Sequence, residues 1–272
     1  GQQAKATGGT SVAVGNGSYA SQGNDVAVGR EAKAVGSNSI AQGTYAYAGA
    51  SGAIALGIRA NATDATTTKT TGANSIAIGM DTNASTNHSV AIGSNATVVS
   101  IAGQTPSTGS VALGASSKVT HVNSVAIGNI SEAVGQNTFA GGNDSHAIGK
   151  SAVAIGDGAG KGTSGVTGGS YASGDDSTAV GAYTKAAGKG STALGLSADA
   201  SALRTVAVGA VSVASAESAI AIGDTATAKT NTGTIAIGKN STASGTSSVA
   251  LGTGTISSEQ SSVAVGNKAN AS

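Results

Sequence analysis

The pentapeptide Ser-Val-Ala-Val-Gly at residues 11–15 recurs as close variants along most of the chain. Its closing glycine marks the repeat, although Gly43 and Gly142 end more divergent pentapeptides. Between Gly15 and Gly266, seventeen such glycines define sixteen intervals, and twelve of these intervals are fourteen residues long. A fixed period sustained over 272 residues is typical of an architecture in which each unit stacks on its neighbours.

The pentapeptide itself has the pattern of a short strand followed by a turn. Its second and fourth positions hold Val, Ile or Leu, and the third is almost always Ala. In a strand, this alternation places the branched pair on one face and Ala on the other. The glycine that follows can adopt a positive φ without a clash at Cβ. We therefore expect turns at the closing glycines, among them Gly15, Gly29, Gly79, Gly93, Gly128, Gly209, Gly223 and Gly266.

A second half-unit of small residues lies between the pentapeptides, as in Ala32-Lys33-Ala34 and Ala198-Asp199-Ala200. Each fourteen-residue repeat is thus interpreted as two short strands, each followed by a tight turn. This pattern predicts an all-β fold, a parallel β-solenoid flattened into a roll with two walls. Hexapeptide solenoids have a longer coil, and calcium-binding nonapeptide repeats need a Gly-Gly-x-Gly-x-Asp pattern that is absent here.

The two faces of the pentapeptide strand must be assigned to the inside and the outside of the roll. We expect the branched residues to form the roll core: Val12, Val14, Val26, Val28, Ile76, Ile78, Val90, Ile92, Val125, Ile127, Ile220, Ile222, Ile235 and Ile237. The alanines between them would form a flat outer face suited to close approach of another copy: Ala13, Ala27, Ala77, Ala91, Ala126, Ala221 and Ala236. The opposite assignment of the faces stays open.

The composition excludes several classes of function. The chain has 43 Gly, one Phe and no Trp, so a compact core of large aromatic residues is not expected. A net charge of +1 gives no basic surface for nucleic acid, and the absence of Cys excludes disulfides and thiolate chemistry. The three histidines stand about two coils apart, too far for one metal site. We expect no catalytic residues, no metal and no cofactor, and no apolar run is long enough to cross a bilayer.

The repeated Ser-(Val/Ile)-Ala-(Val/Ile/Leu)-Gly unit, from about residue 10 to 269, resembles the YadA-like heads of trimeric autotransporter adhesins. The resemblance implies a left-handed parallel β-roll in each subunit and a homotrimer. It also implies display on the Gram-negative cell surface through a coiled-coil stalk and a C-terminal membrane anchor. The sequence contains neither stalk heptads nor barrel strands, and the usual neck segment is missing. We therefore expect residues 1–272 to form a single head, with stalk and anchor outside this sequence.

Four intervals depart from fourteen residues, and the three longest predict insertions at about 58–73, 94–108 and 157–177. Insertions in solenoids map to loops, often on a binding face, although loops without any ligand are the simpler and preferred interpretation. The residues that we select for ligand binding, on the weakest evidence, are Lys69, Lys161, Tyr171, Arg30 and Lys33.

The predicted function is that of a non-enzymatic adhesin head. The resemblance implies attachment to matrix proteins such as collagen, fibronectin or laminin, or to other bacterial cells with autoaggregation or biofilm formation. Trimeric display would supply avidity without a deep pocket. The alternative is an ice-binding or other purely structural solenoid. Ice binding would need a regular threonine ladder, whereas the threonines here cluster near residues 63–71. An enzyme built on a β-helix is disfavoured by the period and by the scarcity of aromatic residues.

Overall fold

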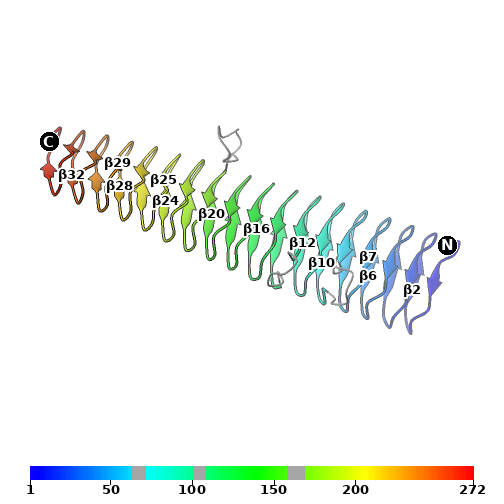
Figure 1. Ribbon diagram of the computed structural model, residues 1–272. Coiled ribbons are helices and arrows are strands. Elements are labelled where there is room, and N and C mark those ends of the chain that lie inside the picture. Colours follow the sequence, from blue (N-terminus) through cyan, green and yellow to red (C-terminus); the bar gives the residue numbers. More distant parts are fainter. Residues whose placement is uncertain (63–71, 101–107, 158–168) are drawn as a thin grey trace. The chain divides into compact units, whose positions relative to one another are not determined.

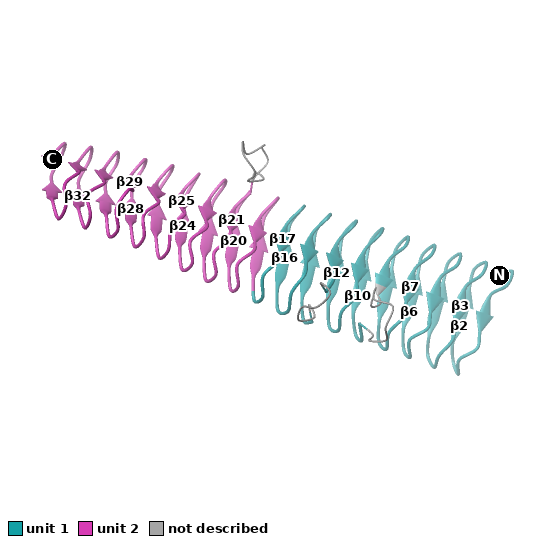
Figure 2. Cartoon of the chain, in the orientation of Figure 1, with its two compact units in different colours: residues 1–137 teal, residues 138–272 magenta. Residues whose placement is uncertain are grey.

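The computed structural model describes residues 1–62, 72–100, 108–157 and 169–272, and it divides the chain into two compact units. Unit 1 is Gly1–Asn137 and unit 2 is Thr138–Ser272 (Figure 2). Each unit is a series of coils, and each coil contributes one two-residue strand and one three-residue strand (Figure 1). Within a unit, every strand pairs in parallel with its counterpart in the next coil, as in the pairing of Ile76 with Val90. Both units are therefore parallel β-solenoids with two walls, which confirms the predicted class of fold.

We call the wall of two-residue strands the narrow wall and the wall of three-residue strands the wide wall. In unit 1 the narrow wall comprises β1 (Lys5–Ala6), β3 (Tyr19–Ala20), β5 (Lys33–Ala34), β7 (Tyr47–Ala48), β9 (Asn61–Ala62), β11 (Asn83–Ala84), β13 (Thr97–Val98), β15 (Lys118–Val119) and β17 (Glu132–Ala133). Its wide wall comprises β2 (Val12–Val14), β4 (Val26–Val28), β6 (Ile40–Gln42), β8 (Ile54–Leu56), β10 (Ile76–Ile78), β12 (Val90–Ile92), β14 (Val111–Leu113) and β16 (Val125–Ile127).

Unit 2 also has a wide wall and a narrow wall. Its wide wall comprises β18 (Phe139–Gly141), β20 (Val153–Ile155), β22 (Thr178–Val180), β24 (Thr192–Leu194), β26 (Val206–Val208), β28 (Ile220–Ile222), β30 (Ile235–Ile237), β32 (Val249–Leu251) and β34 (Val263–Val265). Its narrow wall comprises β19 (His146–Ala147), β21 (Tyr171–Ala172), β23 (Lys185–Ala186), β25 (Asp199–Ala200), β27 (Val213–Ala214), β29 (Thr227–Ala228), β31 (Thr242–Ala243), β33 (Ile256–Ser257) and β35 (Asn270–Ala271).

The regular strands extend into all three predicted insertions. Strand β9 lies within 58–73, β13 within 94–108, and β21 within 157–177. Each pairs in register with the neighbouring coil, as Tyr171 of β21 does with His146 of β19. The described parts of these segments thus continue the repeat, and the additional residues fall within 63–71, 101–107 and 158–168, outside the described residues.

The interior of each roll is built from alanine. The central Ala of the three-residue strand and the second residue of the two-residue strand both point inward, and Ala77 and Ala84 are completely buried. Among the described residues, the larger apolar side chains of the interior are Val98 and Val119, which are neighbours on the narrow wall. The short turns hold the two walls so close together that little more than methyl and hydroxyl groups fits between them.

The predicted assignment of faces is therefore wrong. The branched residues predicted as roll core lie on the outer face of the wide wall, half-buried or exposed: Val12, Val14, Val26, Val28, Ile76, Ile78, Val90, Ile92, Val125, Ile127, Ile220, Ile222, Ile235 and Ile237. The alanines predicted as an outer trimer face point into the roll: Ala13, which is half-buried in the first wide-wall strand, and the fully buried Ala27, Ala77, Ala91, Ala126, Ala221 and Ala236. The physical reason is width, because a branched pair on one wall would collide with the opposite wall.

Serine and threonine complete the interior near the turns. Many of their buried hydroxyls donate to the carbonyl oxygen of the turn glycine three residues earlier, as Thr184 does to Gly181 over 2.9 Å and Ser117 does to Gly114 over 2.9 Å. A buried hydroxyl is costly unless it is hydrogen-bonded, and this local bond satisfies it inside the same turn.

The turn glycines have the conformation that the sequence predicts. In the eight glycines singled out from the sequence, φ lies between 124° and 134°. A Cβ added to Gly181 would lie 2.6 Å from the carbonyl oxygen of Gly195 in the next coil, so the stacking distance itself requires glycine here. Most coils have two further left-handed positions, and both accept side chains, as Asn24 with φ of 59° and Glu31 with φ of 56° show. Gly190, with φ of 64°, occupies the position equivalent to Asn24.

Candidate functional site

The outer face of the wide wall is a column of aliphatic side chains. In unit 2, Ile220 and Ile222 of β28 lie in register with Ile235 and Ile237 of β30. These side chains retain exposure in the single chain: Leu194 is 44% exposed and Leu251 is 42% exposed. An extended apolar surface of this kind is typical of surfaces that bind another molecule.

One strand of the wide wall, β18, contributes side chains of a different shape to this column. Phe139 and Gly141 are the two outward residues of β18, where most other strands of the wall carry two branched side chains. The ring of Phe139 lies over Gly141, and a Cβ added to Gly141 would approach the ring to 2.8 Å. A large residue and an absent side chain therefore compensate each other within a single strand.

The outer face of the narrow wall carries a mixed row of polar and aromatic side chains. The first residue of every two-residue strand points outward, and parallel pairing aligns these residues one per coil. In unit 1 the row is Lys5, Tyr19, Lys33, Tyr47, Asn61, Asn83, Thr97, Lys118 and Glu132. In unit 2 it is His146, Tyr171, Lys185, Asp199, Val213, Thr227, Thr242, Ile256 and Asn270. Neither outer face, over the residues described, is the regular threonine ladder that an ice-binding surface would need.

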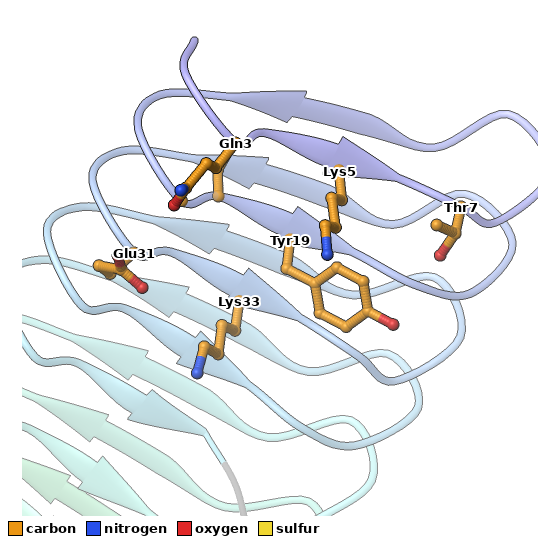
Figure 3. Close-up of a pocket in the computed structure, with 8 residues that line it drawn as sticks. Gln3, Lys5, Thr7, Tyr19, Glu31 and Lys33 are labelled. Atoms are coloured by element: carbon orange, nitrogen blue, oxygen red, sulfur yellow. The ribbon is translucent and has the colours of Figure 1, made fainter.

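An open groove of about 730 Å³ lies at the beginning of the row in unit 1. Its lining includes Lys5, Tyr19 and Lys33 from three successive coils, together with Gln3 and Glu31 from the turns (Figure 3). Lys33 was predicted from the sequence as a ligand-binding residue, whereas Lys5 and Tyr19 were missed. The fourteen-residue spacing of 5, 19, 33 and 47 was the signal that could have found them.

Arg30 and Tyr45 form a contact at the edge of the same wall. The guanidinium of Arg30 donates a hydrogen bond of 2.8 Å to the Tyr45 hydroxyl and lies 5.0 Å from the centre of the ring. This combines a hydrogen bond with a cation–π interaction. Tyr45 remains 48% exposed, and Tyr47, on β7, is 37% exposed. Arg30, also predicted from the sequence, thus belongs to the same basic and aromatic region as Lys33.

Several charged side chains on or near the narrow wall form ion pairs. Arg59 holds the carboxylate of Asp81 with two hydrogen bonds, one of them 2.7 Å long. Chiefly through these hydrogen bonds, the guanidinium lowers the pKa of Asp81 below its ordinary value. Lys118 pairs with Glu132 at 2.6 Å. Exposed pairs of this kind are neutralised locally and contribute little to stability.

Tyr171, the third predicted ligand-binding residue in the described part, lies in a different setting. Its ring centre is 6.3 Å from that of His146, and His146 is 3.0 Å from the carboxylate of Asp144. Two more of the predicted residues, Lys69 and Lys161, lie outside the described residues. In the ranges that the structure describes there is no cluster of potential metal ligands, and no helix there could span a membrane.

The geometry defines a class of protein: a β-solenoid with an alanine interior, an aliphatic outer face on one wall and a variable polar face on the other. Such a molecule offers surfaces for assembly and attachment. The model of the YadA head domain repeat matches residues 1–18, 6–32, 20–46, 34–60, 71–96, 107–129, 172–198, 200–226 and 230–255. These matches cover more than half of the chain, which therefore belongs to the YadA head family. No curated protein matches the chain.

Membership of this family indicates a function of the trimeric autotransporter adhesin type, and the family is one of non-enzymatic adhesins. It also implies that the head is displayed on the outer surface of a Gram-negative cell.

Proposed function

We propose that the chain forms a homotrimeric adhesin head, wound left-handed in each subunit, that attaches the cell to matrix proteins or to other bacterial cells. The observation that carries the assembly is the aliphatic column on the wide wall. A monomer would leave these side chains in water, and burial of apolar surface contributes about 25 cal/mol per Å². Three subunits packed through their wide walls would cover the column around one axis.

This arrangement replaces the alanine interface expected from the sequence. The narrow walls would then face outward, three per trimer, and carry the ligand contacts. Because each coil presents its own row residue, contacts repeat along the surface, and several weak contacts add up to firm attachment. Collagen, fibronectin and laminin are the matrix proteins for which this proposal predicts binding.

Light scattering over a range of concentrations tests the assembly. The expected result is a mass three times the 25.3 kDa of the chain. A folded β-rich monomer at all concentrations would contradict the proposed packing of wide walls. Binding of the trimer to immobilised collagen, fibronectin and laminin, compared with albumin, then tests the proposed class of partner.

A further inference from the structure

The row on the narrow wall begins with a strict alternation of lysine and tyrosine. Lys5 pairs in register with Tyr19, Tyr19 with Lys33, and Lys33 with Tyr47, so these four side chains project from successive coils in one line. Adjacent strands lie about 4.8 Å apart, which places the two lysine positions about 9.6 Å apart with an aromatic ring between them.

The two ammonium groups are available for a ligand. Lys5 and Lys33 are exposed, and neither forms an ion pair with any residue in the described ranges. In Figure 3 the lysines and Tyr19 follow one another along the groove, with Gln3 and Glu31 on one side and Thr7 on the other. Lys118, farther along the same row, differs because its ammonium is already paired with Glu132.

The chemistry of this line fits a sugar polymer with acidic groups. A pyranose ring has an apolar face of C–H groups that packs against an aromatic ring, and its length is close to the spacing between coils. Lysine at every second coil matches an anionic group on every second sugar, held by charge-assisted hydrogen bonds. An extended acidic peptide fits less well, since its side chains on one face repeat at about 6.7 Å.

We propose that Lys5, Tyr19, Lys33 and Tyr47 form a binding site for an acidic polysaccharide that carries carboxylate or sulfate on alternate sugars. The inference deepens the proposed adhesin function and rests on it, because it names the chemistry of one class of partner. Arg30, held against Tyr45, lies at the edge of the same region and adds positive charge to it. Glu31 lies at the side of the groove and opposes anions there.

The test measures binding of the 272-residue chain to size-defined hyaluronan and chondroitin sulfate, by calorimetry or surface plasmon resonance. Hyaluronan carries a carboxylate on every second sugar, and chondroitin sulfate adds a sulfate on the intervening sugars. Neutral dextran and polyglutamate serve as controls. We expect both acidic polysaccharides to bind, more weakly as salt is raised, and dextran not to bind. Binding of polyglutamate as tight as that of the polysaccharides would overturn the proposal.

Variants then locate the site. The double substitution Lys5→Gln with Lys33→Gln is expected to weaken binding about tenfold, through loss of two charged hydrogen-bond donors. The matched control is Lys189→Gln with Lys229→Gln, which removes the same charge from exposed lysines of unit 2 outside the row. An equal loss of binding in both double variants would show a response to net charge alone and would overturn the proposal.

Substitutions of Tyr19 and Glu31 test the site independently of the two lysines. Tyr19→Ser is expected to weaken binding severalfold while Tyr19→Phe retains it, because the ring face and not the hydroxyl makes the contact. Glu31→Gln should strengthen binding by removing repulsion. Unchanged affinity in Tyr19→Ser would contradict the role of the ring.

Failure of this inference can be told apart from failure of the proposed function. A trimer that binds matrix proteins but neither polysaccharide overturns the polysaccharide site and leaves the adhesin head intact. A chain that binds the polysaccharides through Lys5 and Lys33 while remaining a monomer supports the site and contradicts the trimer.

Discussion

The two walls of the roll obey the same rule on the inside and different rules on the outside. Both turn alanine inward, as Ala77 does from the wide wall and Ala84 from the narrow wall. Outward, most wide-wall strands present Val, Ile or Leu, whereas the narrow wall presents mostly Lys, Tyr, Asn, Thr, Glu, His and Asp, with Val213 and Ile256 as aliphatic exceptions. The comparison teaches that, within the strands, the fold constrains only the inward positions. The outward positions are free to serve assembly on one side and recognition on the other.

The largest loss of stability is expected from substitutions that place a larger side chain in the interior of the roll. The loss should be equal whether the substituted alanine belongs to the wide wall or to the narrow wall. Ala77→Leu on β10 and Ala84→Leu on β11 each add a branched side chain where there is no space, so each should reduce the free energy of unfolding by about 3 kcal/mol. Denaturant unfolding followed by circular dichroism measures both. A loss from one wall only would show that the two walls do not share one packed interior.

The second-largest loss of stability is expected from substitution of a turn glycine. Gly181→Ala places a Cβ against the backbone of the next coil at a φ of 130°, with an expected cost of about 2 kcal/mol. Gly190→Asn is the matched control, because φ there is 64° and asparagine occupies the equivalent position in other coils, as at Asn24. Thermal unfolding of the two variants should separate them clearly. Equal stability would contradict the claim that coil stacking requires glycine at position 181.

A sharper contrast comes from placing charge on opposite walls of the same two coils. Ile220→Lys with Ile235→Lys puts two ammonium groups into the aliphatic column, and the mass in solution should fall to the 25.3 kDa of one chain. Thr227→Lys with Thr242→Lys makes the same change on the narrow wall and should leave the mass unchanged. Light scattering measures the mass of both variants. Dissociation of the threonine variant would indicate that the narrow wall, and not the wide wall, forms the interface between subunits.

The smallest effect concerns a surface ion pair and its dependence on pH. The folded state lowers the pKa of Asp81 through Arg59, so the pair stabilises the fold above the ordinary pKa of aspartate. This contribution is lost as pH falls through the lowered value in the folded state. Asp81→Asn should therefore be less stable than the parent at neutral pH and converge with it in acid. Parallel stability curves for the two proteins across this range would contradict the assignment.

The architecture could be predicted from the sequence because the repeat period and the turn residues determine each coil from the residues of that coil alone. Fourteen-residue spacing and glycine at the end of the pentapeptide specify coils and their register without reference to the rest of the chain. The assignment of faces failed because the expectation that branched residues are buried was applied to a roll too narrow to hold them.

A correct assignment was nevertheless available within the repeats. The central alanine hardly varies from coil to coil, whereas the flanking positions include Gln42, Phe139 and Thr178. A position inside a narrow space admits one residue size, and a position on a surface admits many. Variation among the copies therefore marked the outer face.

The lysine–tyrosine line shows a different limit of reasoning from sequence. Lys5, Tyr19, Lys33 and Tyr47 are separated by unrelated residues and form no contiguous motif. They are recognised as neighbours only when successive coils are aligned and residues at the same position of each coil are compared. Lys69 and Lys161 belong to sequence intervals longer than fourteen residues and lie outside the described residues, so comparison of successive coils does not reach them.

The close approach of successive turn glycines, described for Gly181 and Gly195, also has a consequence for the gene. Within each unit, a described coil pairs only with the coil before and after it, and these pairings are nearly alike. A DNA segment that encodes one coil can therefore be duplicated or deleted with both new neighbours still matching. Replication slippage would then change the number of coils in a unit without altering the residues that either wall presents. A lineage could lengthen or shorten the head in whole coils and keep the outward residues of the coils that remain.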